Sequence, residues 1–283
     1  MKTIRKIPYI VLPACITLLV IFALSAAADP LLRYYGVDAG QGDCSLFILP
    51  GGETIVIDAG PEKTSRRTMK YIKSCGVRKI DLLVATHPHE DHIGGMRTLM
   101  AAFPVGMVWD SGYNYGSYIQ ERFYRDIKKR NIPFKIVSRG YSARLGNVEL
   151  EVLAPARRIT GTRSDANNNS IIMLITYGNI SFLMTGDMER EEYVSIRPLP
   201  RATVLKAAHH GSGNSTSRQL MLEVSPEIVV LNYEKGNSYG YPHRETVAEI
   251  RRSGARRFDT ADGAVKLYTD GTSLIFDGKR EVK

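Results

Sequence analysis

Cysteine and histidine are both scarce in this sequence, whose 283 residues include three cysteines and six histidines. Cys15 lies in an apolar N-terminal run, so only Cys44 and Cys75 remain in the rest of the chain. These two lack the spacing of metal ligands, which excludes a zinc site built from thiolates. Whether they form a disulfide stays open, because Cys44 lies in a strand pattern and Cys75 ends a helical one.

Repeats, low-complexity tracts and linkers are absent as well. The charged fraction of 24% is ordinary, which excludes long disordered stretches. Hydrophobic residues make up 43% of the chain, enough to form the core of one large domain. The formal net charge of +9 favours polyanionic partners such as nucleic acid or anionic lipid, and a solvated basic surface is the alternative.

The first 28 residues have the pattern of an export signal. Lys2, Arg5 and Lys6 precede an apolar run over residues 7–24, and Ala26 and Ala28 follow in an Ala-x-Ala arrangement. We predict a signal peptide at residues 1–28 and a folded domain at 29–283. A run of this length also spans a bilayer, so the alternative is an uncleaved membrane anchor. In both cases the domain is exported, either secreted, periplasmic or on the outer face of the cytoplasmic membrane.

Short apolar runs and amphipathic stretches alternate from Leu31 onward, which predicts an α/β fold. Strands are predicted at 32–40, 43–50, 53–60, 79–87, 105–110, 148–155, 170–178, 180–187, 202–210 and 227–233, with a hairpin at 264–278 turning at Asp270-Gly271. Helices are predicted at 65–76, 94–103, 117–131, 217–224 and 244–254. The two similar halves fit two sheets packed face to face, with helices outside.

Half of the histidines fall in the segment "HPHEDH", directly after the apolar strand 79–87. His87 and His89 can turn toward one point, while Asp91 and His92 offer an oxygen and a nitrogen to a second point. A helix is expected to begin at about Ile93. Imidazole and carboxylate together suit zinc, and equally manganese or iron.

Three more candidate ligands follow later strands. Asp187 ends the strand "NISFLMTGD", and His209 and His210 end "ATVLKAAHH". Ligand groups at the ends of neighbouring strands converge, so we expect these side chains to meet the first set. A turn residue is the alternative for Asp187.

The motifs together resemble a known family, the extracellular hydrolase domain of ComEC/Rec2 competence proteins, which has the metallo-β-lactamase fold. The resemblance rests on "VDAGQGDCSLFI", "ETIVIDAG", "THPHEDHIGG", "ANNNSIIMLITYGNISFLMTGD", "LKAAHHGSGNSTS" and "NSYGYPHRET", which occur in the family's order over about 32–276. It implies a four-layer αββα sandwich and a site for two divalent ions, zinc or manganese.

For the first ion, the resemblance implies His87 and His89 as ligands, with Asp187 bridging to the second. The broader fold supplies one more histidine to this ion, and here the segment "DANNNSII" has none. Asn168, Asn169 and Ser170 stand in its place, so weaker binding is expected.

For the second ion, the resemblance implies Asp91, His92 and His209, with His210 as a substitute for His209 or as a proton donor. Two such ions would lower the pKa of a bridging water and so provide a hydroxide for the attack. The resemblance implies that Asp91 would also orient this hydroxide. Catalytic roles are therefore expected for Asp91 and His210.

Four polar residues around these ligands are predicted to contact substrate: Asn169, Ser170, Ser212 and His243. Hydroxyl groups of the stretch 212–217 are suited to donate hydrogen bonds to a phosphate. Capping of the following helix is the alternative role for this stretch.

A phosphodiester substrate is favoured by two further features. Basic residues, which phosphate backbones need, occur in two clusters: Arg122, Arg125, Lys128, Lys129 and Arg130, and Arg251, Arg252, Arg256 and Arg257. The loop "WDSGYNYGSY" carries Trp109, Tyr113, Tyr115 and Tyr118, which are suited to stack on bases of a single strand. Each feature has a plain alternative, namely charged outer faces of helices and a loop packed on its own domain.

The sequence therefore predicts an exported metal-dependent hydrolase, a phosphodiesterase or nuclease acting on DNA, with single-stranded DNA as the expected substrate. The alternatives are a β-lactamase-like hydrolase of another ester or amide, and a non-catalytic module that guides DNA.

Overall fold

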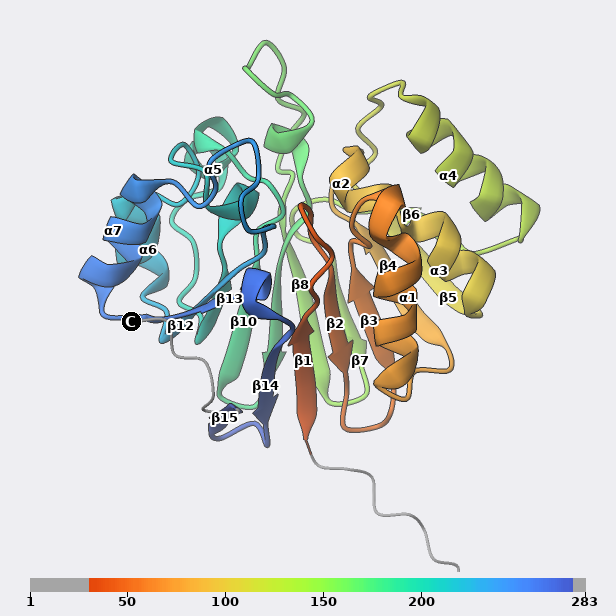
Figure 1. Ribbon diagram of the computed structural model, residues 1–283, viewed down its shortest axis with the longest axis horizontal. Helices are drawn as coiled ribbons and strands as arrows, with labels where there is room; N and C mark the ends of the chain where they lie inside the picture. Colours follow the sequence, from red (N-terminus) through yellow and green to blue (C-terminus); the bar gives the residue numbers. More distant parts are fainter. Residues whose placement is uncertain (1–30, 277–283) are drawn as a thin grey trace, which may run out of the picture.

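The computed structural model describes residues 31–276, so the signal-peptide and anchor predictions, which concern 1–28, lie outside the described residues. Two sheets face each other, and helices cover the outer face of each (Figure 1). Among the helices of the described range, none has the length and apolarity that crossing a membrane requires.

The first sheet contains eight strands within the described range. They are β1 (Leu32–Gly36), β2 (Ser45–Ile48), β3 (Thr54–Ile57), β4 (Ile80–Ala85), β5 (Val105–Asp110), β6 (Phe134–Ile136), β14 (Val265–Thr269) and β15 (Leu274–Phe276). Their order is β15-β14-β1-β2-β3-β4-β5-β6, antiparallel from β15 to β3 and parallel from β3 to β6.

The second sheet contains seven strands within the same range. They are β7 (Ser142–Leu145), β8 (Val148–Ala154), β9 (Ile172–Tyr177), β10 (Ile180–Met184), β11 (Val204–Lys206), β12 (Ile228–Leu231) and β13 (Arg256–Asp259). Their order is β13-β12-β11-β10-β9-β8-β7, with β10 to β13 parallel. The carboxyl ends of these parallel strands lie at one edge, where ligand-bearing loops are expected.

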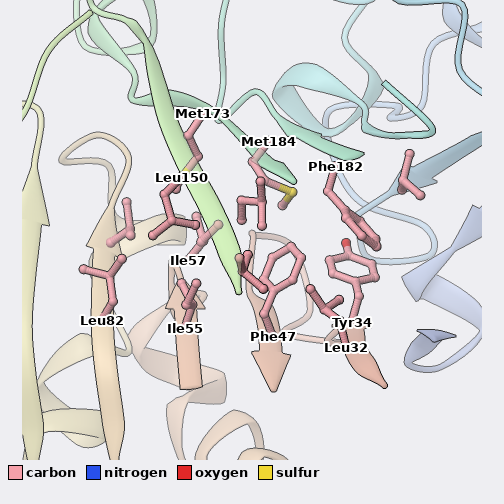
Figure 2. Packing of buried hydrophobic residues seen from close by; sticks show 14 of the residues in the cluster. Leu32, Tyr34, Phe47, Ile55, Ile57, Leu82, Leu150, Met173, Phe182 and Met184 are labelled. Carbon is pink, nitrogen blue, oxygen red and sulfur yellow. The ribbon is translucent and has the colours of Figure 1, made fainter. Parts of the chain in front are cut away.

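Three apolar layers explain the four-layer arrangement. The layer between the sheets contains Phe47 and Phe182, one from each sheet, whose ring centroids are 5.4 Å apart (Figure 2). A second layer packs the first sheet against α1 (Ser65–Ser74), α3 (Met96–Ala102) and α4 (Tyr118–Lys129). A third packs the other sheet against α5 (Arg190–Ile196), α6 (Arg218–Val224) and α7 (Arg244–Ser253). The predicted αββα sandwich is therefore confirmed.

Strand β4 illustrates why the apolar runs predicted strands so well. Leu82 and Val84 face the other sheet, whereas Leu83 and Ala85 face the helices. A strand buried on both faces is a nearly continuous apolar run, broken in β4 only by the half-buried Asp81, which makes it visible in the sequence.

Elements that the sequence did not predict are short, exposed or charged. They are β6, whose three residues are exposed, β7, β13 with its Arg256–Arg257 pair, and the seven-residue α5. The expected helix start at Ile93 was wrong, because a short helix α2 (Glu90–Ile93) carries Asp91 and His92 themselves. Cys44 and Cys75 are free thiols, which answers the question of a disulfide.

Candidate metal centre

The candidate ligands gather where strands of both sheets end. His87 follows β4, Asp187 follows β10, and His209 and His210 follow β11. Asp187, His209 and His210 line a pocket of about 370 Å³ together with Asp91 of α2, and His87 lies beside Asp187. Helix α2 is in the upper part of Figure 1. The strand ends that carry the candidate ligands therefore converge, as the sequence predicts.

Four side chains form the tightest group. One ligand atom from each of Asp91, His92, Asp187 and His210 lies within 4.8 Å of every other. His92 Nε2 is 3.2 Å from Asp187 Oδ1, and His210 Nε2 is 3.1 Å from Asp91 Oδ2. Two imidazoles and two carboxylates at such distances make a suitable donor set for a zinc or manganese ion.

Hydrogen bonds on the far side of both rings fix which nitrogen is free. His210 Nδ1 is 2.8 Å from the Asn232 carbonyl, which only accepts, so Nδ1 carries the proton. His92 Nδ1 likewise donates to Asp58 Oδ2 at 2.7 Å. Each Nε2 lone pair is thereby directed toward a carboxylate. Metal-bound histidines have the same arrangement, in which the other ring nitrogen donates a hydrogen bond.

Two of these atoms have no hydrogen-bond partner although they are buried. His92 Nε2 and Asp187 Oδ1 face each other in this state. Two buried acceptors at 3.2 Å repel unless a proton or cation lies between them. The residues present therefore fit a divalent cation.

Electrostatics agree with this fit. Burial alone would lower the pKa of His210, but Asp187 and Asp43 raise it to about 10. Burial would raise the pKa of Asp91, but His92 and His210 lower it to about 2. The carboxylates thus stabilise positive charge within the group of four side chains. A bound cation would provide this charge in place of the protons on the imidazole rings.

The other two histidines of "HPHEDH" lie beside this group. His87 Nε2 is 3.0 Å from His89 Nδ1 and 3.9 Å from Asp187 Oδ2. Burial and neighbouring His92 keep the pKa of His87 well below its usual value, so the ring is neutral and able to donate a lone pair. Asp187 lies between the two sets of histidines.

The double histidine has an unusual backbone. His209 and His210 both have left-handed φ values, 48° and 55°, and Gly211 continues the turn with φ 86°. Such strain is uncommon outside glycine and is typical of functional sites. It directs the His210 ring toward Asp91 and the His209 ring toward Glu189, whose Oε1 is 3.3 Å from His209 Nδ1.

This turn favours one of the two alternatives left open by the resemblance, in which His210 substitutes for His209. His210, not His209, occupies the position beside Asp91 and His92. His209 Nε2 instead lies 3.8 Å from Asp187 Oδ2, on the side of His87.

The motif "GQGD" packs against the backbone of Asp91 and so helps to fix its position. A Cβ at Gly42 would lie 2.3 Å from the Asp91 carbonyl oxygen, so only glycine allows the turn to pack there. The Asp43 amide donates to that same oxygen at 3.1 Å. Its carboxylate is paired with the buried Lys206, whose Nζ also donates to the Gly186 carbonyl at 3.0 Å.

The supporting residues Asp58, Lys206, Glu189 and Asn232 were missed from the sequence. Asp58 also accepts hydrogen bonds from the Thr86 amide and hydroxyl, at 2.9 and 2.7 Å. A signal for it was present, since Asp58 ends the apolar run of "TIVID" as Asp187 ends its own strand.

The four residues predicted to contact substrate have partners within the protein. The Asn169 amide bonds Ile159 and the Asp165 carbonyl, and Ser170 Oγ accepts from the Asp187 amide at 3.2 Å. Ser212 is buried, and both ring nitrogens of His243 contact backbone groups, of Gly213 and Tyr239. These side chains are absent from the pocket lining, where Asn167 lies instead.

The aromatic and basic clusters divide in the structure. Trp109 is buried in the core against Tyr141, so its predicted stacking on bases was wrong. Tyr115 and Tyr118 are exposed. In the backbone register of the second sheet, Arg256 of β13 lies beside Ile228 of β12, at the amino-terminal ends of these strands and away from the pocket. The Arg257 guanidinium forms an ion pair with Asp259.

Comparison with known proteins decides the family. The profile of the metallo-beta-lactamase superfamily matches residues 37–231, which include every candidate ligand. The chain belongs to this superfamily. Members of the superfamily are metal-dependent hydrolases, and this chain has a histidine–aspartate cluster whose atoms are close enough to hold a metal ion.

Within the superfamily, the chain is similar to competence proteins. It is 28% identical over 245 residues to Recombination protein 2 of Haemophilus influenzae, covering 84% of this chain and 28% of that protein. It is 25% identical over 254 residues to ComE operon protein 3 of Bacillus subtilis, covering 82% of this chain and 32% of that protein. The chain thus spans about a third of these relatives.

Among solved structures, the metallo-beta-lactamase fold protein YhfI of Bacillus subtilis superposes with a TM-score of 0.54 at 13% identity. The match covers 81% of this chain and 95% of that one. At this level of sequence identity, the similarity shows a shared fold and nothing more.

Proposed function

We propose that the chain is an exported metal-dependent phosphodiesterase that hydrolyses DNA. Residues 1–28 are its signal peptide or anchor, with membrane association through 7–24 in the anchored form, and 29–283 are its hydrolase domain. The observation that carries the reaction is the group of Asp91, His92, Asp187 and His210, with its buried, unpartnered acceptor atoms. The DNA substrate is supported by similarity to competence proteins over more than four fifths of the chain.

We assign two divalent ions, zinc or manganese, to this pocket. Asp91, His92 and His210 would hold one, His87 and His89 would hold the other, and Asp187 would serve both from its place between the two sets of histidines. His209 completes the second of these sets, in place of the histidine that the segment 165–172 lacks. Its Nδ1 faces the carboxylate of Glu189, so its Nε2 lies on the side of Asp187, where the Tyr241 hydroxyl also contacts it at 3.1 Å.

When bound, two such ions would lower the pKa of a water molecule toward neutrality and would stabilise negative charge on the reacting oxygens. The protein's own groups fix the geometry. Asp91 is the most accessible carboxylate of the group, with 31% of its side chain exposed, and its low pKa keeps it ready to accept a hydrogen bond from water. His210 serves as a ligand and not as a proton donor, because its Nδ1 proton is held by the Asn232 carbonyl.

The negative charge of the pocket lining also favours metal-dependent hydrolysis of a phosphodiester over binding of DNA without metal. Its lining contains Glu90, Asp91 and Asp187 but no lysine or arginine. A phosphodiester would be repelled by these carboxylates unless cations were bound among them. Substrate binding and catalysis therefore depend on the same ions.

A panel of substrates tests the proposal. We expect the purified chain, loaded with zinc or manganese, to cleave a single-stranded oligonucleotide and a chromogenic phosphodiester, and to leave a chromogenic β-lactam intact. Turnover should disappear with a chelator and return with metal. Opening of the β-lactam without cleavage of either phosphodiester would replace the proposal with a lactamase, and DNA binding without any hydrolysis would replace it with a guiding module.

A further inference from the structure

Two exposed tyrosines line the pocket, one from each half of the fold. Tyr115 lies on the loop between β5 and α4 of the first sheet, and Tyr239 on the loop between β12 and α7 of the second. Their exposed fractions are 54% and 62%. Large aromatic side chains left in solvent beside a reactive pocket are typical of binding surfaces.

Both rings are supported from behind by groups of the site. Tyr115 meets the His89 ring edge to face, with centroids 5.1 Å apart. Tyr239 stacks on Tyr241 at 5.4 Å and an interplanar angle of 12°, and the Tyr241 hydroxyl is 3.1 Å from His209 Nε2. One face of each outer ring thus remains for a ligand that also reaches the candidate metal ligands.

A single amide side chain holds each loop. Gln120 Oε1 accepts from the Tyr115 and Gly116 amides at 2.9 and 3.0 Å, and its Nε2 donates to the Tyr113 carbonyl at 2.7 Å. Asn237 Oδ1 accepts from the amides of Tyr239 and Tyr241, both at 3.1 Å. The rings are therefore already in position, and a ligand does not bear the cost of ordering them.

We propose that Tyr115 and Tyr239 are stacking platforms for two unpaired bases, one on either side of the phosphate bound at the pocket. The site would then select single-stranded nucleic acid, because paired bases in a duplex already stack on one another and cannot cover both rings. This inference rests on the proposed phosphodiesterase function and adds the form of its substrate. Base–aromatic contacts need no particular base, so sequence tolerance is expected.

The test compares a fluorescent, nuclease-resistant phosphorothioate oligothymidylate with an abasic strand of the same length and charge, both titrated onto the metal-loaded chain. We expect the normal strand to bind about tenfold more tightly than the abasic one, on the scale of a single base–aromatic contact. Tyr115→Ala and Tyr239→Ala should each reduce this preference, whereas Tyr115→Phe and Tyr239→Phe should retain it. Retention by the phenylalanine variants also separates stacking from a folding defect.

Tyr118→Ala is the matched control, because Tyr118 is 65% exposed on neighbouring α4 but does not line the pocket. Equal binding of normal and abasic strands by the wild type, or an equal loss in the Tyr118 variant, would overturn the inference. A wild type that cleaves the chromogenic phosphodiester yet ignores the bases would refute the stacking platforms alone. One that prefers bases yet cleaves no phosphodiester would refute the proposed reaction alone.

Discussion

Replacing Asp187 or Asp91 with asparagine is expected to reduce phosphodiester hydrolysis about 100-fold or more, on the scale of metal activation and positioned proton acceptors. Asp187 lies between the two sets of histidines, so loss of its charge weakens both. Asp91 contacts His210 and faces the pocket, so its loss affects the reacting water as well. Initial rates on the chromogenic phosphodiester at saturating metal measure both effects.

Asp262→Asn is the control for this experiment, since Asp262 is an exposed aspartate that does not line the pocket. Its turnover should equal that of the wild type. Near-normal rates in Asp187→Asn with full metal content would show that the bridging assignment is mistaken.

The double histidine should divide its contribution between the two metal positions. We expect His210→Ala to weaken the tighter position, because four ligand atoms lie within 4.8 Å of one another there. His209→Ala should weaken the looser one, because His209 replaces a missing ligand. Each variant should retain roughly one ion per chain after dialysis against dilute metal, where the wild type retains about two. Elemental analysis and titration with a competing metal indicator give the content and the two affinities.

His243→Ala is the histidine control, since His243 itself does not line the pocket and its ring nitrogens contact the backbone of Gly213 and Tyr239. Its metal content should be unchanged. If His209→Ala and His210→Ala lost the same ion, the separate roles would be wrong, and the left-handed turn at 209–211 would have no function in dividing them.

The positions of most candidate ligands were predictable because these residues follow strands buried on both faces. Apolar runs such as those before His87 and Asp187 identify such strands, and parallel strands bring their carboxyl ends to one edge. The sandwich itself followed from the same pattern. The charged β13 and the exposed β6 were not predicted, since their residues do not alternate between core and solvent.

The choice between His209 and His210 could not be read from the chain. It depends on three consecutive left-handed residues, and two of them are not glycine. The same limit applies to the residues behind the ligands. Asp58 meets His92 across 34 positions of sequence, and the Asn232 carbonyl meets His210 across 22. Such pairings depend on how the sheets pack, which local patterns do not encode.

Polar residues in loops were the least predictable. Asn169 and His243 lie close in sequence to ligands or to the pocket rim, yet their side chains bond the backbone of their own loops. Buried loop backbone must be paired, and a nearby amide or imidazole often provides the partner. Tyr239, which the sequence did not indicate, instead faces the pocket.

A metal titration of single-stranded DNA cleavage by residues 29–283, starting from chelator-treated protein, measures directly whether the hydrolysis depends on bound metal. We expect no cleavage without metal, activity that rises with added zinc or manganese, and saturation at about two ions per chain. Cleavage that persists in full after complete removal of metal, or its absence at full occupancy of both positions, would refute the proposed metal-dependent hydrolysis.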